Sequence, residues 1–167
     1  ILYSSFAFLK HFQSRGKNKA LNIVRGINFS VRDENMHSEA GSWTYRTQKK
    51  EEQRSQEEMQ LVESRIKDSA LMIFEHESRI IDMMWEKGDI SGITKEDLKI
   101  FVKSRINICL GNLEIQPIFE FDPESNTIET WFYDSINKFV FNDFFSGISR
   151  EYVRDWDEER DRKSTRL

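Results

Sequence analysis

Apolar residues recur every three or four positions along residues 59–87, and this helical period constrains the fold more than any other feature of the sequence. The stripe consists of aliphatic, methionine and aromatic side chains: Val62, Ile66, Ala70, Leu71, Ile73, Phe74, Ile80, Ile81, Met84 and Trp85. A stripe this wide normally packs into a core. The 167 residues include only 7 Gly and 2 Pro, too few for the many turns of an all-β fold. The sequence therefore predicts an all-α protein.

Two helices are expected before this segment. The apolar pattern of residues 1–14 stops before Gly16, which suits a left-handed helix end, and a second long helix is predicted over residues 18–47. Glycine inside a helix costs about 1 kcal/mol relative to alanine, and it usually marks close packing of neighbouring backbones. We therefore expect Gly26 and Gly41, both inside the second helix, to lie at helix contacts.

Local signals bound the remaining helices. Residues 48–58 hold no core residues and are predicted to form a loop plus the solvated start of the next helix. Thr94, with Asp97 three residues on, resembles a capping box that opens a fourth helix. A turn at residues 122–126 should precede a short aromatic helix over residues 127–137.

Charge, cysteine content and hydropathy narrow the functional classes. The formal charge of -4 comes from interspersed acids and bases without a basic stripe, so nucleic acid is not an expected partner. The lone cysteine, Cys109, fits a reducing compartment and is expected to be a small buried residue. No apolar run approaches the ~20 residues that span a bilayer, and no signal peptide is evident. We expect a cytoplasmic protein without a membrane partner.

Most histidines and tryptophans suggest no special chemistry. His11 lies among basic residues and His76 lies between two glutamates, so both are expected to be solvated. Trp43, Trp85 and Trp131 are too scattered to form a ligand box, and each is expected to pack against other helices.

Residues 31–37 carry the most informative chemistry. Glu34 and His37 lie at positions i and i+3, about 60° apart on one face of a helix whose neighbouring stripe is apolar. A buried carboxylate or imidazole is unfavourable unless it is paired or bound to a metal, so two on one core face indicate a shared ligand. Glu-x-x-His is the recurring ligand pair of di-iron and di-manganese helical bundles. Taken alone, the motif also occurs in many helices as a surface pair.

The wider context resembles the small subunit of class I ribonucleotide reductase. Residues 32–34 read Arg-Asp-Glu and His37 follows, as in the second metal-binding helix of that family. Further similarities occur in the family's order at residues 3–8, 85–88, 93–95, 142–145 and 150–152. The resemblance implies the C-terminal portion of a ferritin-like helical bundle.

The resemblance also implies a division of the chain. Residues 1–138 would form the partial bundle, and residues 139–167 a flexible tail with a segment that docks on the large subunit. Residues 150–167 are highly charged and are expected to be disordered by themselves. Because the chain has no initiator Met and opens in mid-helix, we expect a fragment that lacks an N-terminal half.

Residue roles follow from the same resemblance. Glu34 and His37 match a carboxylate ligand and a histidine ligand of the second metal ion. Asp33 matches an aspartate that orients the histidine ligand of the other metal ion, as outer ligand contacts generally do. Tyr152 matches the tyrosine that relays a radical to the large subunit.

A second set of residues matches the apolar wall around the family's buried radical. Its members are Leu2, Phe6, Ile27 and Ser30. Ser30 departs from the usual aliphatic residue, so either the pocket is more polar in this protein or the register slips locally.

The implied metal site is incomplete in this chain. The family uses an Asp, two Glu-x-x-His pairs and a lone Glu, and this chain supplies only the final pair, Glu34 and His37. By the same register the lone Glu would lie just before Ile1, with the other ligands and the radical tyrosine further upstream. The expected cofactor is a di-iron centre, or a manganese and iron pair, that this chain cannot complete.

The implied function is the reduction of ribonucleotides to deoxyribonucleotides for DNA replication. The small subunit would make a radical with its metal pair and pass it through Asp33 and Tyr152 to a cysteine of the large subunit. Expected partners are that large subunit, a second small subunit and the missing N-terminal half. The chain alone is expected to be inactive.

Two other interpretations stay open. Another di-metal carboxylate component, such as an oxygenase or desaturase, would share the Glu-x-x-His pairs, although the aromatic tail up to Tyr152 argues against it. The second interpretation is a split helical piece that docks on another chain and does no chemistry.

Overall fold

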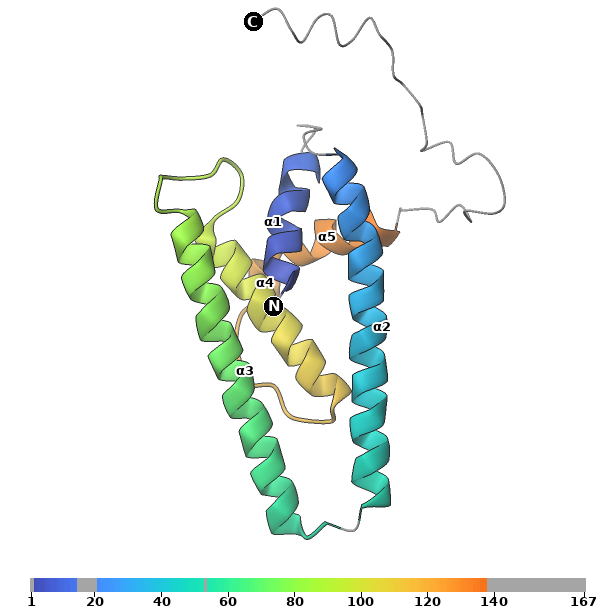
Figure 1. Ribbon diagram of the computed structural model, residues 1–167. Helices are drawn as coiled ribbons and strands as arrows, with labels where there is room; N and C mark the ends of the chain where they lie inside the picture. Colours follow the sequence, from blue (N-terminus) through green and yellow to red (C-terminus); the bar gives the residue numbers. More distant parts are fainter. Residues whose placement is uncertain (1, 15–20, 53, 138–167) are drawn as a thin grey trace, which may run out of the picture. The chain divides into compact units, whose positions relative to one another are not determined.

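Five helices, α1 to α5, make up the described part of this computed structural model, which is residues 2–14, 21–52 and 54–137 (Figure 1). Their bounds are α1 Leu2–Ser14, α2 Leu21–Glu51, α3 Gln56–Met84, α4 Lys95–Asn112 and α5 Thr127–Asn137, with a 3₁₀ turn, η1, at Pro123–Ser125. The described residues contain no strand, so the predicted all-α fold is confirmed. The expected tail, residues 139–167 with Tyr152, lies outside the described residues.

Capping boxes begin both α3 and α4. The predicted one is confirmed, because the Asp97 amide donates to Thr94 Oγ1 at 3.1 Å and the Thr94 amide donates to Asp97 Oδ2 at 2.8 Å. Ser55 and Glu58 form an equivalent box at 2.9 and 3.2 Å. Since α2 and α3 both extend into residues 48–58, the connection between them is shorter than predicted.

The α4 helix is the centre of the packing. It contacts α1, α2, α3 and α5, while α1 also packs against α2 and α5. In Figure 1, α1 and α4 lie between the long helices α2 and α3. The core draws buried side chains from every helix and from the segment after α3: Ala7, Ile27, Val31, Ile81, Trp85, Ile93, Leu98, Phe101, Val102, Ile128 and Phe132.

Large apolar side chains stay exposed on the two long helices. On α2 they are Ile23, Phe29, Met36 and Trp43, and on α3 they are Leu61, Leu71, Met72, Ile73, Ile80 and Met83. The predicted core stripe of residues 59–87 is therefore only partly correct. Ile81 is fully buried, whereas Leu71, Ile73 and Ile80 are exposed, because the main packing partner of α3 among the described helices is α4.

Within the described residues neither glycine of α2 lies at a helix contact, contrary to the prediction. A methyl group at Gly26 or Gly41 would meet no atom of the described residues within 4 Å. Both positions are exposed. Their helix-weakening effect is therefore not explained by close backbone packing.

Two predictions about aromatic and imidazole side chains are also wrong. Trp43 is 63% exposed, although Trp85 is buried and Trp131 packs against the core as expected. His11 is buried, with Nε2 3.0 Å from the carbonyl oxygen of Ser91. Basic residues lie near His11 in sequence, but its ring points into the protein. No helix in the described ranges is long and apolar enough to cross a membrane.

Candidate functional site

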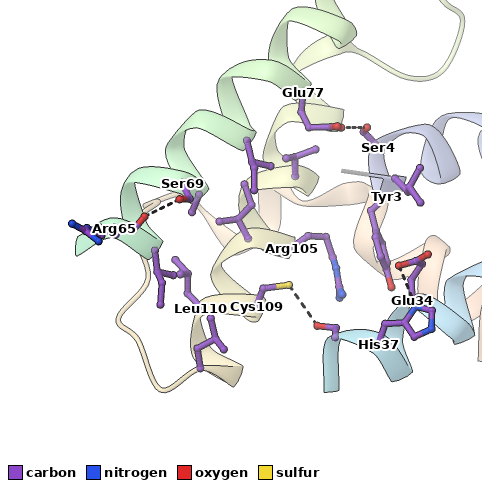
Figure 2. Close-up of a pocket in the computed structure, with 18 of the residues that line it drawn as sticks. Tyr3, Ser4, Glu34, His37, Arg65, Ser69, Glu77, Arg105, Cys109 and Leu110 are labelled. Carbon is purple, nitrogen blue, oxygen red and sulfur yellow. Dashed lines mark hydrogen bonds and ion pairs between the residues drawn. The ribbon is translucent and has the colours of Figure 1, made fainter. Parts of the chain in front are cut away.

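The α2 helix brings Glu34 and His37 together at the edge of a cavity. Glu34 Oε2 lies 3.8 Å from His37 Nδ1, as the i, i+3 spacing of the two residues requires. Their side chains are 39% and 73% exposed, and both line the cavity (Figure 2). The two side chains thus lie on one face of α2, as predicted, but at an accessible edge and not on the core face that we expected.

The cavity has a volume of about 720 Å³ and walls from α1, α2, α3 and α4. Its apolar lining comes mainly from two helices: Val62, Ile66, Ala70 and Ile73 of α3, and Val102, Ile106, Leu110 and Leu113 at and after α4. A volume of this size falls within the range of about 300–1,000 Å³ that is typical of binding sites. Glu34 and His37 are therefore polar groups at the edge of a mostly apolar space.

A carboxylate and an imidazole are both common metal ligands, and each can donate from this cavity edge. The described residues contain no group of three or more His, Cys, Asp or Glu that could hold a metal ion. The donor set therefore fits part of a metal site. Glu34 and His37 would need further ligands from outside the described residues.

The other predicted residues of α1 and α2 scatter around this pair. Leu2 lines the cavity, whereas Ile27 belongs to the core and Phe6 packs against that core. Asp33 and Ser30 are exposed and are not among the cavity residues. Of the four predicted wall residues, the structure thus brings only Leu2 to the cavity that holds Glu34 and His37.

Tyr3 is a cavity residue that the sequence did not single out for chemistry. Its hydroxyl donates to Asn35 Oδ1 at 2.5 Å and lies 3.5 Å from the Val31 carbonyl oxygen. Burial raises the pKa of Tyr3 above its usual range, so the phenol stays protonated and remains a donor. This contact joins α1 to α2 beside Glu34.

Glu77 is a buried carboxylate in the same cavity wall. It is 3% exposed, and its Oε2 accepts a hydrogen bond from Ser4 Oγ (Figure 2). Glu77 follows Ile73 by four positions on the apolar stripe of α3, so the reasoning that singled out Glu34 could have found it. Glu77 does not join Glu34 and His37 in a group of metal ligands.

Arg105 of α4 lies in the cavity wall, which also includes Arg65 of α3. Its Cζ lies 4.4 Å from the ring centre of Tyr3 and 5.6 Å from that of Tyr133, and its Nη1 donates to the Tyr133 hydroxyl. Burial raises the pKa of Tyr133 to about 12. Cys109, expected to be buried, is half-buried in the same wall, with Sγ 4.0 Å from Ser38 Oγ.

Comparison with known proteins shows which family the sequence matches. The family model described as "Ribonucleotide reductase, small chain" matches residues 1–127. The chain is similar to a protein of Invertebrate iridescent virus 3 that is named probable ribonucleoside-diphosphate reductase small subunit 048L. The two are 26% identical over 156 residues, which cover 92% of this chain and 39% of the relative. The chain thus spans about two fifths of the length of the curated relative it matches.

Proposed function

The chain belongs to the ribonucleotide reductase small-chain family, and from that premise we propose that it contributes Glu34 and His37 to the di-metal site of a ribonucleoside-diphosphate reductase small subunit. The observation that carries the proposal is their placement 3.8 Å apart on the edge of one cavity. The all-α, ferritin-like fold agrees with the di-metal helical bundles in which Glu-x-x-His pairs project inward.

In this proposal Glu34 binds a metal ion through its carboxylate and His37 binds through its imidazole. The remaining ligands come from helices outside the described residues. When bound, a di-iron or a manganese and iron pair supplies the one-electron oxidation that starts radical chemistry. The chain itself contributes apolar cavity walls beside the ligands and the Tyr3–Asn35 hydrogen bond, which holds α2 against α1 beside Glu34.

The complete subunit would act with partners. We propose a large subunit as the site of nucleotide reduction, a second small subunit, and further helices that complete the bundle. The exposed apolar side chains of α2 and α3 support the last of these, since large apolar surfaces usually mark contacts. Asp33 and Tyr152 are proposed to carry the radical toward the large subunit.

The metal ligands can be tested on this chain with Mn²⁺ and NMR. Paramagnetic Mn²⁺ should broaden the resonances of His37 and of its neighbours on α2, and should leave those of exposed His76 sharp. A Glu34→Ala/His37→Ala variant should lose the broadening, whereas Glu39→Ala, an exposed acid on the same helix, should keep it. Broadening that persists in the double variant would contradict the proposal.

One observation favours a second candidate function. Because the described residues offer only two clustered donors, the chain could be a non-catalytic helical partner that docks on another polypeptide. Pairing this chain with the part of the viral relative that it does not cover separates the two functions. If metal loading of the assembled pair is lost in the Glu34→Ala/His37→Ala variant, the enzyme function is supported. If the two chains assemble and load metal equally well with this variant, the non-catalytic partner is supported.

A further inference from the structure

Arg105 has no acidic partner in the part of the chain that the structure describes. Tyr3 and Tyr133 flank its guanidinium, and one arm donates to the Tyr133 hydroxyl. Its Nε is buried and has no hydrogen-bond partner among the described residues. None of the ion pairs formed by those residues involves Arg105. A fixed cation with unused donors therefore lies in the cavity wall.

This setting is unfavourable unless an anion completes it. A buried donor without an acceptor costs about 1–3 kcal/mol, and stacking on aromatic rings offsets only part of the desolvation of a charge. A guanidinium pairs best with a carboxylate, which can accept two parallel N–H bonds from its planar fork. Because the two rings already fix the plane of Arg105, little side-chain freedom remains to be lost when such a partner binds.

The surface around Arg105 is apolar and elongated. Val62, Ile66 and Ile73 line the cavity along α3, and Ile80 lies on the same face seven residues beyond Ile73, with 47% of its surface exposed. From Val62 to Ile80 this face runs for about 27 Å at the rise of an α-helix. Figure 2 shows Arg105 between the α3 side of the cavity and Tyr3.

We propose that the groove between α2 and α3 binds an amphipathic helix whose apolar face covers Val62, Ile66, Ile73 and Ile80 and whose carboxylate side chain pairs with Arg105. The proposal deepens the proposed function, which already requires helices from outside the described residues, by naming the chemistry of one of them. The acid that pairs with Arg105 is a structural partner and not a metal ligand.

A helix fits the groove better than a small carboxylate such as a fatty acid. A small molecule in the cavity would leave Ile80 and Met83 of α3 in water. A helix packed along α3 would cover these side chains as well as the cavity, with the ridge and groove contacts usual for helix pairs.

The test uses this chain and synthetic amphipathic peptides of about 20 residues, long enough to span the face of α3. Each peptide carries a single Glu at one position of its apolar face, the series moves that Glu along the peptide, and each member has a matched Gln peptide. Fluorescence anisotropy measures binding in buffer with EDTA. We expect at least one Glu peptide to bind about tenfold more tightly than its Gln match, equivalent to about 1.4 kcal/mol.

Variants assign that preference to Arg105. In Arg105→Met the Glu and Gln peptides should bind alike, whereas Arg79→Met, which alters an exposed arginine of α3 outside the cavity, should keep the tenfold ratio. Circular dichroism checks that Arg105→Met is folded. If it is not, the ratio measured on the unaltered chain still decides the proposal.

Three outcomes would overturn it. They are equal binding of all Glu and Gln peptides by the unaltered chain, no binding of any peptide, and displacement of a bound peptide by dodecanoate at a similar concentration. The last would make the cavity a small-carboxylate site. Because the peptides are free of histidine and the buffer is free of metal, the result is independent of the Mn²⁺ test of Glu34 and His37. Either proposal can fail alone.

Discussion

Two regions of the molecule differ in how far their charged side chains are exposed to solvent. At the contacts of α1 with its neighbours, Lys10 and Glu77 are 1% and 3% exposed. At the middle of α2, the side chains of Glu34 and His37 are 39% and 73% exposed. The candidate ligands are therefore more accessible than Lys10 and Glu77, although Glu77 lines the same cavity.

The partners of the buried charges explain the difference. Lys10 Nζ donates to Asn28 Oδ1 and lies 5.8 Å from the ring centre of Phe132, while Glu77 accepts from Ser4. Each buried charge is thus held by a neutral hydrogen-bonding group, which satisfies its geometry without a counter-ion. In this chain the two buried charges belong to helix contacts, whereas Glu34 and His37 stay accessible at the cavity edge.

The largest expected effect comes from Lys10. Burial lowers its pKa from 10.5 to about 8, so below pH 8 the folded state holds an ammonium that it disfavours. Between pH 8 and 10.5 the folded state releases the proton that the unfolded state keeps, and stability should rise with pH. Urea unfolding should show a gain of about 2 kcal/mol between about pH 7.5 and 9.5. Lys10→Met should abolish most of this slope, and an unchanged slope would contradict burial of the charge.

Ser4, which donates a hydrogen bond to the buried Glu77, should give an effect of about the same size. Ser4→Ala leaves the Glu77 carboxylate without its donor and should lower the free energy of unfolding by about 2 kcal/mol. Ser5→Ala is the matched control, because Ser5 is exposed and should change stability by less than about 0.5 kcal/mol. Equal effects of the two changes would show that the Ser4–Glu77 bond contributes little.

The glycines of α2 should give a smaller effect of opposite sign. A methyl group at Gly26 or Gly41 meets no atom within 4 Å among the described residues, so only the helix propensity changes. Gly26→Ala and Gly41→Ala should each raise the stability of this chain by about 0.5–1 kcal/mol in thermal or urea unfolding. Destabilisation by either change would reveal a contact at that glycine.

The smallest effect on stability should come from the candidate ligands. Glu34→Ala and His37→Ala remove partly exposed side chains, and each should change the free energy of unfolding by less than about 0.5 kcal/mol. Together they should still remove Mn²⁺ binding. A loss of stability as large as that of Ser4→Ala would place Glu34 or His37 among the structural charges.

The sequence predicted the helices well because their apolar period is strong, and the predicted Thr94–Asp97 cap is present. It also placed Glu34 and His37 on one face, since the spacing alone fixes that geometry. The short connection between α2 and α3 was missed, because the charged run hides the Ser55–Glu58 box. A charged run of this kind is equally compatible with a loop and with a helix end that faces solvent.

Other parts of the site depend on contacts that one sequence does not show. Arg105 meets Tyr3 and Tyr133 across three helices, and no periodic pattern links residues so far apart. Lys10 and His11 are buried because they share the inward face of α1 with Ala7, at positions i+3 and i+4. Because both side chains are polar, a pattern based only on apolar residues did not include them in the buried face and assigned His11 to solvent.

The exposed apolar residues of α2 and α3 include three methionines, whose side chains can be oxidised. Met36, Met72 and Met83 are 65%, 59% and 64% exposed. Peroxide converts accessible thioethers to sulfoxides, and the change from an apolar to a polar side chain weakens helix contacts. Oxidation of the free chain would therefore reduce its capacity to assemble, and a helix seated along α3 would shield the thioethers that it covers. Mass spectrometry of sulfoxide formation at these methionines would then record which helix faces a partner occupies.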